Sequence, residues 1–351
     1  MDGTQFTVCI CCTTFNHSRY IKDAVSGFVM QETDFPFVAT IVDDASTDGE
    51  PQVLREYYYR YFDYENSEVA YQEEAEYGTI LYAQHRVNRN CFFAIVLLKE
   101  NHFSQNKNKL PYYGRWSDKA EFIALCEGDD YWTDPKKLQA QVDFLNEREE
   151  YSLCCHRYKI YNQNLDTWEE DYVKRLFENH PDGFSFTRAE NLKTWITKTM
   201  TLMYRRDCFD EKEMQLFKYR CDEHLNYLLL SRGPGFCFPF FGAVYRKTDS
   251  GVFAPLPEKE KRIRGVLIRS ELLTYNLQDI VLRDDVFGRL KKFIYQYGPF
   301  SGMKIPIWVC LKSYYKTDGF KGCLRSAKKL LGAYIKGFST VSKSRNLMKS
   351  L

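Results

Sequence analysis

The amino-acid sequence predicts an α/β fold in which a mostly parallel, Rossmann-like sheet is flanked by helices and followed by a helical C-terminal extension. Three observations support this prediction. The first 50 residues alternate between strand and helix patterns, polar loops follow the strand patterns, and the chain reads as wholly helical after about residue 255. Consecutive parallel strands joined by a helix end at the same edge of a sheet, and folds of this kind bind their ligands there.

The strand and helix patterns of the N-terminal part follow one another in a clear order. Apolar residues at helical spacing predict a helix over 20–31, between strand patterns at 6–12 and 37–42. Asp134 before Pro135 marks the start of another helix, because Asp is a good N-cap and Pro suits the first helical position. The other expected elements are a helix over 51–64, strands over 79–83, 92–98, 122–126 and 236–245, and a helix over 222–230.

Two polar stretches lie between these elements. The acidic residues 68–77 are expected to form a loop or an irregular helix. The Lys- and Asn-rich residues 99–109 are expected to form either a mobile loop beside the ligand site or a solvated linker. Further helices are expected over 261–283 and 285–297, so we place the boundary between an N-terminal domain (1–255) and a C-terminal helical region (256–351) at residue 255.

Charge is distributed unevenly along the 351-residue chain. Residues 300–351 contain 11 Lys and Arg but one acid, Asp318, which leaves 38 basic and 46 acidic residues before them. A nucleic-acid-binding protein would carry its positive charge on the folded domain, so this composition argues against that class. The 12 cysteines lack a disulfide-framework spacing, and neither a signal-peptide pattern nor a run of about 20 apolar residues is visible. We therefore expect a cytoplasmic protein.

The most informative motif is Glu127-Gly-Asp-Asp-Tyr-Trp132, which follows a predicted buried strand. Adjacent carboxylates at such a strand end repel each other unless a cation neutralises them, and hard divalent cations prefer carboxylate oxygens. Asp129 and Asp130 are therefore candidates for binding Mg²⁺ or Mn²⁺, which would in turn hold two phosphates. The alternative is that the pair caps the following helix, although Asp134 already suits that role.

A second acidic pair, Asp43 and Asp44, follows the neighbouring predicted strand in the loop Asp43-Asp-Ala-Ser-Thr-Asp-Gly49. A carboxylate at this place can accept a hydrogen bond from the N3–H group of uracil or from a ribose hydroxyl. Turn formation alone would also favour this composition. The sequence contains neither a G-x-G-x-x-G motif after the first strand nor a P-loop, which argues against dinucleotide oxidoreductases and P-loop nucleotidases.

Taken together, these motifs resemble those of family 2 glycosyltransferases with the GT-A fold, in particular those of bacterial capsule and surface-polysaccharide synthesis. The resemblance covers about residues 5–255, and its five motifs stand in the family's order. They are Cys12-Thr-Thr-Phe-Asn16 with Tyr20-Ile21, Val42-Asp-Asp-Ala-Ser-Thr-Asp-Gly49, Glu127-Gly-Asp-Asp-Tyr-Trp-Thr-Asp-Pro135, Cys221-Asp-Glu-His-Leu225 and Tyr245-Arg-Lys-Thr-Asp-Ser-Gly251.

The resemblance implies a metal-dependent, inverting transfer of a sugar from a nucleoside diphosphate donor, UDP-linked by preference, to a hydroxyl of a saccharide or lipid-linked saccharide. Phe15 would stack on the base, Asp44 would accept a hydrogen bond from it, and Asp222 would be the general base, with Glu223 as the alternative. Thr248 stands where many relatives have a histidine, so a third metal ligand or a phosphate contact is in question there. The implied donor-binding residues are Thr13, Phe15, Asn16, Asp43, Asp44, Ser46 and Asp129, and the implied metal ligands are Asp129 and Asp130.

The C-terminal region contains a basic amphipathic helix pattern over residues 320–338. Its apolar face and its lysines suit an anionic lipid surface, where each basic residue contributes about 1 kcal/mol. We therefore expect the protein at the inner face of the plasma membrane. The alternative is that the apolar face packs on the catalytic domain. Two other function classes also remain open, a sugar-nucleotide-binding protein without turnover and a sugar-phosphate nucleotidyltransferase.

Overall fold

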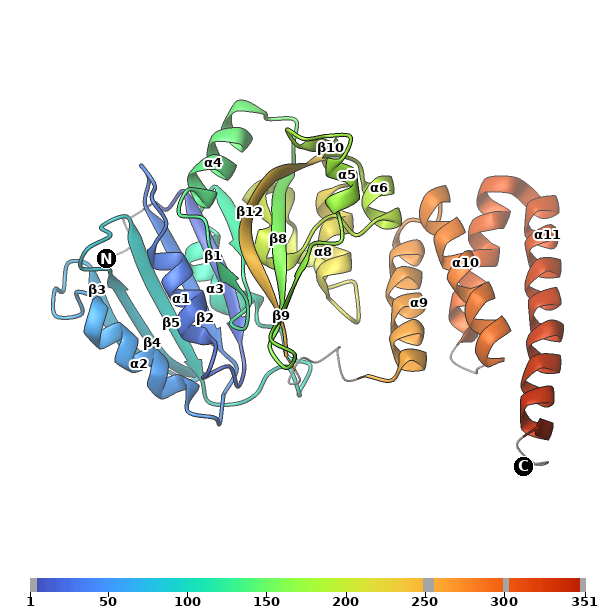
Figure 1. The fold of residues 1–351 in the computed structure, drawn as a ribbon, viewed down its shortest axis with the longest axis horizontal. Coiled ribbons are helices and arrows are strands. Elements are labelled where there is room, and N and C mark those ends of the chain that lie inside the picture. Colours follow the sequence, from blue (N-terminus) through green and yellow to red (C-terminus); the bar gives the residue numbers. More distant parts are fainter. Residues whose placement is uncertain (1–4, 249–255, 299–302, 348–351) are drawn as a thin grey trace. The chain divides into compact units, whose positions relative to one another are not determined.

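The computed structural model describes residues 5–248, 256–298 and 303–347 (Figure 1). Side chains are described up to residue 336. Contacts divide the chain into two compact units. The first comprises Met1–Arg188, Trp195–Glu211 and Leu228–Thr248, and the second comprises Ala189–Thr194, Lys212–Tyr227 and Asp249–Leu351. The boundary that we expect at residue 255 lies outside the described residues. Each unit is described by itself below.

A 12-stranded mixed sheet forms the centre of the first unit, in the order β10-β12-β8-β11-β6-β1-β2-β5-β4-β3, with β7 paired to β12 and β9 to β8. The pairs β6-β1, β1-β2, β2-β5 and β8-β12 are parallel. The central strands β6, β1, β2 and β5 are parallel and helices flank the sheet, which confirms the predicted fold class. The strands are β1 (Val8–Thr14), β2 (Phe37–Asp43), β3 (Ala70–Ala75), β4 (Gly78–Gln84), β5 (Cys91–Leu98), β6 (Phe122–Leu125), β7 (Tyr131–Trp132), β8 (Leu153–Asn162), β9 (Thr167–Glu170), β10 (Phe184–Phe186), β11 (Met203–Arg205) and β12 (Gly235–Lys247).

Helices cover both faces of this sheet. Phe28 on one face packs edge-on against Trp132, and Tyr57 stacks on Phe93 with ring centroids 6.3 Å apart. On the other face, Trp116 stacks on Tyr82. The helices of the first unit are α1 (Ile21–Val29), α2 (Glu50–Tyr61), α3 (Leu110–Ser117), α4 (Lys137–Glu147) and α5 (Lys174–Phe177), with 3-10 turns η1 (Thr199–Thr201) and η2 (Arg206–Cys208). Helices α6 (Arg188–Lys193), α7 (Glu211–Met214) and α8 (Asp222–Leu229) lie mostly in the second unit.

Strand β1 sets the position of the polar loops, because it is parallel to both of its neighbours. Thr14 at its end lies beside Asp43 of β2, and Cys11 lies beside Leu125 of β6. The loops after β1, β2 and β6 therefore leave the sheet at the same edge, as the sequence predicts.

Two predictions for the first unit are wrong in detail. The acidic stretch 68–77 contains β3, an edge strand whose residue Tyr71 pairs with Tyr82 of β4, because an edge strand leaves one side to solvent and tolerates charged residues there. Helix α4 begins at Lys137 instead of directly after Asp134. The Asp134 carboxylate still accepts a hydrogen bond from the backbone N–H of Lys136 (2.8 Å), inside the turn that precedes the helix.

The second unit contains α9 (Glu258–Tyr275), α10 (Ile280–Tyr297) and α11 (Lys304–Leu347), of which α11 is kinked at Gly319 (φ 70°). The prediction of a continuous helix over 261–283 is wrong, because α9 ends at Tyr275 and α10 begins at Ile280. The Asp279 carboxylate caps α10 by accepting from the N–H of Leu282 (3.0 Å). None of the helices among the described residues combines the length and apolar character needed to cross a bilayer.

Candidate donor and metal site

The loops after β1 and β2 are hydrogen-bonded to each other at the carboxyl edge of the sheet. Ser46 Oγ accepts from the backbone N–H of Asn16 (2.8 Å), and Asn16 Oδ1 accepts from the N–H of Thr47 (2.8 Å). Asn16 adopts a left-handed backbone conformation (φ 57°), which Asn tolerates better than most residues. The structure thus brings the predicted residues Asn16 and Ser46 together, as the pair that joins the two loops.

Glu50, the first residue of α2, is a buried carboxylate that the sequence analysis missed. It accepts hydrogen bonds from the Thr14 hydroxyl, from the backbone N–H of His17 (2.8 Å) and from Ser46 Oγ (2.9 Å). Burial raises the pKa of Glu50, and these donors oppose that shift. An acid placed directly before Pro51, at the start of a helix and after a polar loop, is the sequence signal that could have found it.

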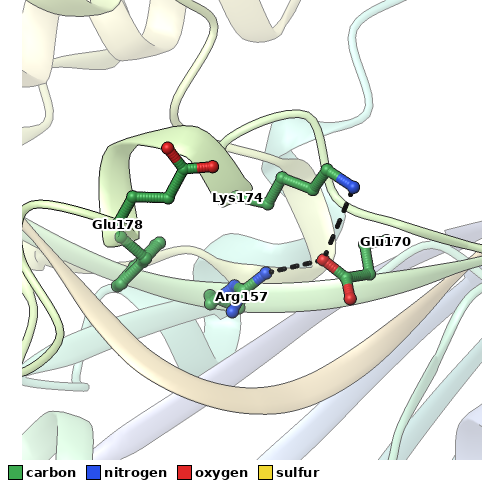
Figure 2. A pocket seen from close by; sticks show the side chains of 5 residues that line it. Arg157, Glu170, Lys174 and Glu178 are labelled. Atoms are coloured by element: carbon green, nitrogen blue, oxygen red, sulfur yellow. Dashed lines mark hydrogen bonds and ion pairs between the residues drawn. The ribbon is translucent and has the colours of Figure 1, made fainter.

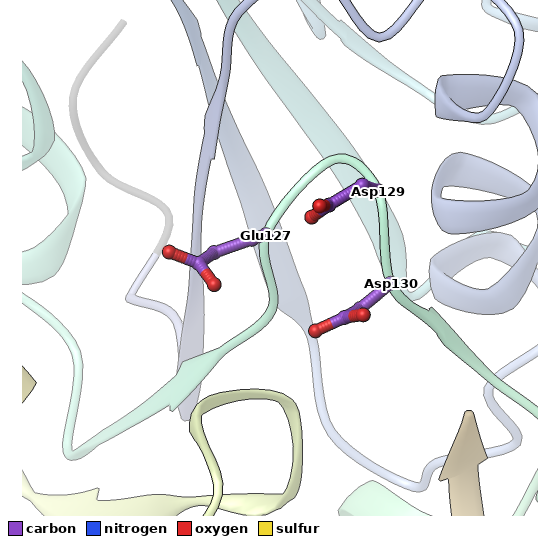
Figure 3. A group of neighbouring side chains, drawn as sticks. All are labelled: Glu127, Asp129 and Asp130. Atoms are coloured by element: carbon purple, nitrogen blue, oxygen red, sulfur yellow. The ribbon is translucent and has the colours of Figure 1, made fainter. Parts of the chain in front are cut away.

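The loop after β6 carries a cluster of three carboxylates, Glu127, Asp129 and Asp130 (Figure 3). One oxygen atom from each lies within 4.8 Å of the others. Burial, together with the nearby Asp129 and Glu127, raises the pKa of Asp130 well above its usual value. In the part of the chain that the structure describes, Asp130 forms no ion pair with a lysine or arginine. A hard divalent cation is the ligand that such a donor set fits.

Arg246 on β12 is hydrogen-bonded to the loop after β6 that contains Glu127, Asp129 and Asp130, called the acidic loop below. Its backbone N–H donates to Asp130 Oδ1 (2.8 Å), and its Nε donates to the backbone carbonyl of Asp129 (2.9 Å). The guanidinium also pairs with Asp23 (2.6 Å) and lies over the rings of Tyr20 and Tyr131. The motif Tyr245-Arg-Lys was noted in the sequence, but this positioning role depends on contacts that only the fold reveals. Thr248, two residues further, is buried.

Gly128 lets the acidic loop approach the loop after β1. A Cβ atom placed on Gly128 would overlap the Thr14 hydroxyl and lie 3.2 Å from His17 Nδ1. Glycine is therefore required for this close approach and not for an unusual backbone angle.

Replacing Gly128 with alanine is expected to destabilise the protein by roughly 1–3 kcal/mol, because one of the two loops must move. Gly288→Ala on α10 is the matched control, since nothing lies within 4 Å of its Cβ position and an alanine favours a helix. Urea unfolding of both variants measures the difference. An equal stability for both would contradict the close approach.

The remaining predicted donor residues have different surroundings. Thr13 Oγ1 lies 2.6 Å from the Tyr113 hydroxyl, and the Phe15 ring is 41% exposed. Asp44 is fully buried and accepts from the backbone N–H groups of His102 (2.7 Å) and Phe103 (3.0 Å) and from Lys109 Nζ (3.0 Å). The polar stretch 99–109 therefore lies beside the site and is bonded to it through Asp44.

Asp43 is also fully buried, but one of its oxygens, Oδ1, has no hydrogen-bond partner among the described residues. The other oxygen accepts from the N–H of Ser46 (3.2 Å). Burial raises the pKa of Asp43 from 3.8 to about 6.

This shift predicts a pH-dependent effect of the variant Asp43→Asn. Between pH 4 and 6 the folded protein binds more protons at Asp43 than the unfolded chain, so the contribution of Asp43 to stability falls as the pH rises through this window. Asp43→Asn is expected to raise the free energy of unfolding at pH 8, by up to roughly 3 kcal/mol, and by less at pH 4.5. Denaturant unfolding at the two pH values tests this, and an equal effect at both would exclude a raised pKa.

Asp222 and Glu223, the candidate general bases, begin α8 and belong to the second unit. Asp222 is exposed, whereas the Glu223 carboxylate is bonded to Arg269 (2.8 Å), which also pairs with Asp285 (2.7 Å). Burial raises the pKa of Glu223, and Arg269 opposes this shift.

Cys221 and His224 hold the start of α8 in place. The backbone N–H of Cys221 donates to His224 Nδ1 (3.4 Å), which also lies 3.3 Å from Cys221 Sγ, an arrangement similar to a capping box. Burial lowers the pKa of His224 to about 4, so this histidine is neutral at pH 7. These contacts join the first residues of α8, where Asp222 and Glu223 lie, to His224.

A separate pocket is lined by Arg157, Glu170, Lys174, Phe177 and Glu178 (Figure 2). Glu170 Oε2 lies 3.5 Å from Arg157 and 3.9 Å from Lys174, and Arg157 also pairs with Asp171. The basic groups are thus neutralised by neighbouring acids, which disfavours a diphosphate. None of the five residues belongs to the motifs at the carboxyl edge.

Comparisons with known proteins support the fold. No family model matches the chain. Uncharacterised proteins of Mycobacterium bovis and Mycobacterium tuberculosis are 32% identical to it over 147 residues, which cover 42% of this chain and 34% of those proteins. The chain thus spans about a third of the length of these relatives.

Among solved structures, Staphylococcus aureus TarS 1-349 resembles nearly the whole chain. The complex with UDP has a TM-score of 0.56 at 14% identity, and the complex with UDP-GlcNAc has 0.57 at 15%, each covering 96% of this chain and 92% of TarS 1-349. A mannosyltransferase from Pyrobaculum calidifontis in complex with GDP-Man and Mn²⁺ matches with a TM-score of 0.47 at 14% identity and covers 96% of this chain. With the sheet order described above, the likeness to TarS 1-349 defines the fold of the chain as GT-A.

Proposed function

We propose that this chain is a metal-dependent glycosyltransferase that moves a sugar from a nucleoside diphosphate donor, UDP-linked by preference, to a hydroxyl group. The observation that carries the proposal is the meeting of three loops at one edge of a GT-A sheet, which places Asp129 and Asp130 beside the loops of Asn16 and Ser46. The binding of UDP and UDP-GlcNAc by TarS supports the choice of donor.

The donor base would lie between Phe15 and the end of β2. The Phe15 ring is exposed and can stack on a base. Asp44 already accepts three hydrogen bonds, whereas Asp43 Oδ1 has no partner among the described residues. We therefore assign acceptance of the uracil N3–H group to Asp43, with Asp44 fixing the loop that closes this side.

The diphosphate would lie over Asp129 and Asp130, whose carboxylates fit a divalent cation. Mn²⁺ or Mg²⁺ bound there would neutralise the charge that develops on the leaving diphosphate. Arg246 keeps Asp130 oriented through its backbone N–H group.

Asp222 is the residue that we assign as general base. In an inverting reaction the base takes the proton of the acceptor hydroxyl while its oxygen attacks C1 of the sugar and the bond from C1 to the diphosphate breaks. Glu223 is paired with Arg269 and is therefore the less suitable acid.

The acceptor that we propose is a saccharide or lipid-linked saccharide of a bacterial surface polysaccharide, reached at the inner face of the membrane. Helix α11 carries an exposed apolar stripe, including Phe320, Leu324, Leu331 and Ile335. The exposed basic residues beside it are Lys321, Arg325, Lys328, Lys329 and Lys336. Leu330 and Ala333 are buried, so the helix presents one apolar side inside its own unit and a second one to solvent. Phe338, at the end of the predicted pattern, lies outside the described side chains.

This surface predicts binding to anionic vesicles. Leu331→Ser with Ile335→Ser, whose side chains are 59% and 61% exposed, is expected to reduce cosedimentation with phosphatidylglycerol vesicles. Val87→Ser, at an 85% exposed valine of the first unit, is the matched control. Binding should weaken with salt. Equal binding to neutral phosphatidylcholine vesicles, or no effect of the double variant, would exclude this surface.

Release of UDP from a panel of UDP-sugars, with and without Mn²⁺ and candidate saccharide acceptors, tests the proposed function. We expect release that needs both the metal and one acceptor. UDP binding without release in any combination would favour a non-catalytic binding protein. Pyrophosphate release from UTP and a sugar phosphate would instead identify a nucleotidyltransferase.

A further inference from the structure

His17 lies between the loop after β1 and the acidic loop. Its side chain is 15% exposed, its Nδ1 atom lies 3.1 Å from Thr14 Oγ1, and its Nε2 atom lies 3.9 Å from Asp129 Oδ2. The backbone N–H of His17 donates to Glu50 (2.8 Å), which fixes the residue at both its main chain and its ring. The Nδ1 atom is thus hydrogen-bonded within the protein, and the Nε2 atom faces the Asp129 carboxylate.

The hydrogen bonds around Thr14 assign the tautomer of His17. The Glu50 carboxylate accepts three hydrogen bonds, and the single hydroxyl hydrogen of Thr14 is donated to it. Thr14 Oγ1 must therefore accept from His17 Nδ1–H. In the neutral imidazole this leaves the lone pair on Nε2, on the side of Asp129. The order carboxylate, hydroxyl, imidazole resembles the outer-shell chain that orients metal-binding histidines.

From this geometry we infer that His17 Nε2 is a nitrogen ligand of the divalent cation, beside Asp129. The inference rests on the proposed function, since it extends the same metal site. Two ligands of one octahedral ion at about 2.1 Å lie roughly 3 Å apart when adjacent and roughly 4 Å apart when opposite, so the separation of 3.9 Å from Asp129 is compatible with a shared ion.

Mn²⁺ binding followed by electron paramagnetic resonance tests this assignment. Pulsed spectra of the full chain with Mn²⁺, alone and with UDP, should show coupling to a histidine nitrogen, which changes to the ¹⁵N pattern when the histidines are ¹⁵N-labelled. His17→Gln is expected to remove the coupling and to weaken Mn²⁺ binding at least about 10-fold. His180→Gln, at an exposed histidine, is the matched control and should keep both.

Thr14→Val separates the ligand from its support. This variant keeps the imidazole but removes the partner of Nδ1, so we expect the nitrogen coupling to remain and Mn²⁺ affinity to fall about 10-fold or more. It also keeps the inference testable if His17→Gln does not fold. If Thr14→Val shows the same nitrogen coupling as the wild type but binds Mn²⁺ more weakly, this result supports the hydrogen-bonded series from Glu50 through Thr14 to His17.

The outcomes distinguish the inference from the proposed function. If the wild type binds no Mn²⁺, or binds it equally in Asp130→Asn, the proposed metal site itself fails. If Mn²⁺ binding depends on Asp130 but shows no histidine nitrogen, or if the coupling survives in His17→Gln, the metal site stands and His17 is not a ligand.

Discussion

Turnover of a UDP-sugar is expected to fall at least about 10²- to 10³-fold when Asp130 is replaced by asparagine. The amide has nearly the same shape as the carboxylate, but it removes the charge that would hold the divalent cation, and the cation contributes several kcal/mol to the stabilisation of the transition state. Asp130 is buried in the acidic cluster, so no bulk water can replace its oxygen freely.

Kinetics with and without added Mn²⁺ provide the measurement for Asp130→Asn. Because the carboxylate is buried and lies close to Asp129 and Glu127, its neutralisation should leave the free energy of unfolding of the metal-free protein equal or higher. Asp143→Asn, which makes the same chemical change on the exposed side of α4, is the control and should leave turnover unchanged. Full activity of Asp130→Asn at ordinary Mn²⁺ concentrations would refute the role of Asp130.

The second large effect is expected at the start of α8. Asp222→Asn should lower kcat about 10²- to 10⁴-fold, the usual contribution of a general base, while the melting temperature remains close to that of the wild type because the side chain is exposed. Glu223→Gln should instead leave kcat close to that of the wild type, because the Glu223 carboxylate is already paired with Arg269. Since burial raises the pKa of Glu223, neutralising it should leave the free energy of unfolding equal or higher at pH 7.

The comparison of the two variants decides which acid is the base. Single-turnover rates and thermal unfolding, measured on the same preparations, separate a loss of chemistry from a loss of fold. A stable Glu223→Gln protein that lacks turnover, beside an active Asp222→Asn protein, would reverse the assignment.

The central strands and helices of the first unit could be predicted because their patterns are local. The apolar runs of β1, β2 and β5 and the amphipathic spacing of α1 can each be recognised within one short stretch of consecutive residues. Strand β3 could not be predicted in this way, since Glu73 and Glu74 look like loop residues until the strand is known to lie at the edge of the sheet. The break before α10 depends on one cap, Asp279, in a sequence that otherwise continues a helical pattern.

Residues of the candidate site could be predicted where the metal-binding groups stand together in one short motif. They could not be predicted where the contacts join distant parts of the chain. The carboxylates of Asp129 and Asp130 are evident from the sequence. Glu50 and Arg246 are not, because their function depends on hydrogen bonds to residues 30 or more positions away. The hydrogen bonds of Asp44 could not be predicted for the same reason. Its carboxylate accepts from the backbone N–H of His102 and from Lys109 Nζ, which lie about 60 positions away in the sequence and are held beside the site by it.

Thermal stabilisation of the purified chain by UDP, GDP, dTDP and CMP, each with and without Mn²⁺, tests the central claim most directly. A ligand that binds only the folded state raises the melting temperature. We expect a rise with UDP that needs Mn²⁺ and is lost in Asp130→Asn. A nucleotide shift that is independent of both the metal and Asp130, or no shift with any nucleotide, would contradict a metal-dependent donor site at the carboxyl edge of this sheet.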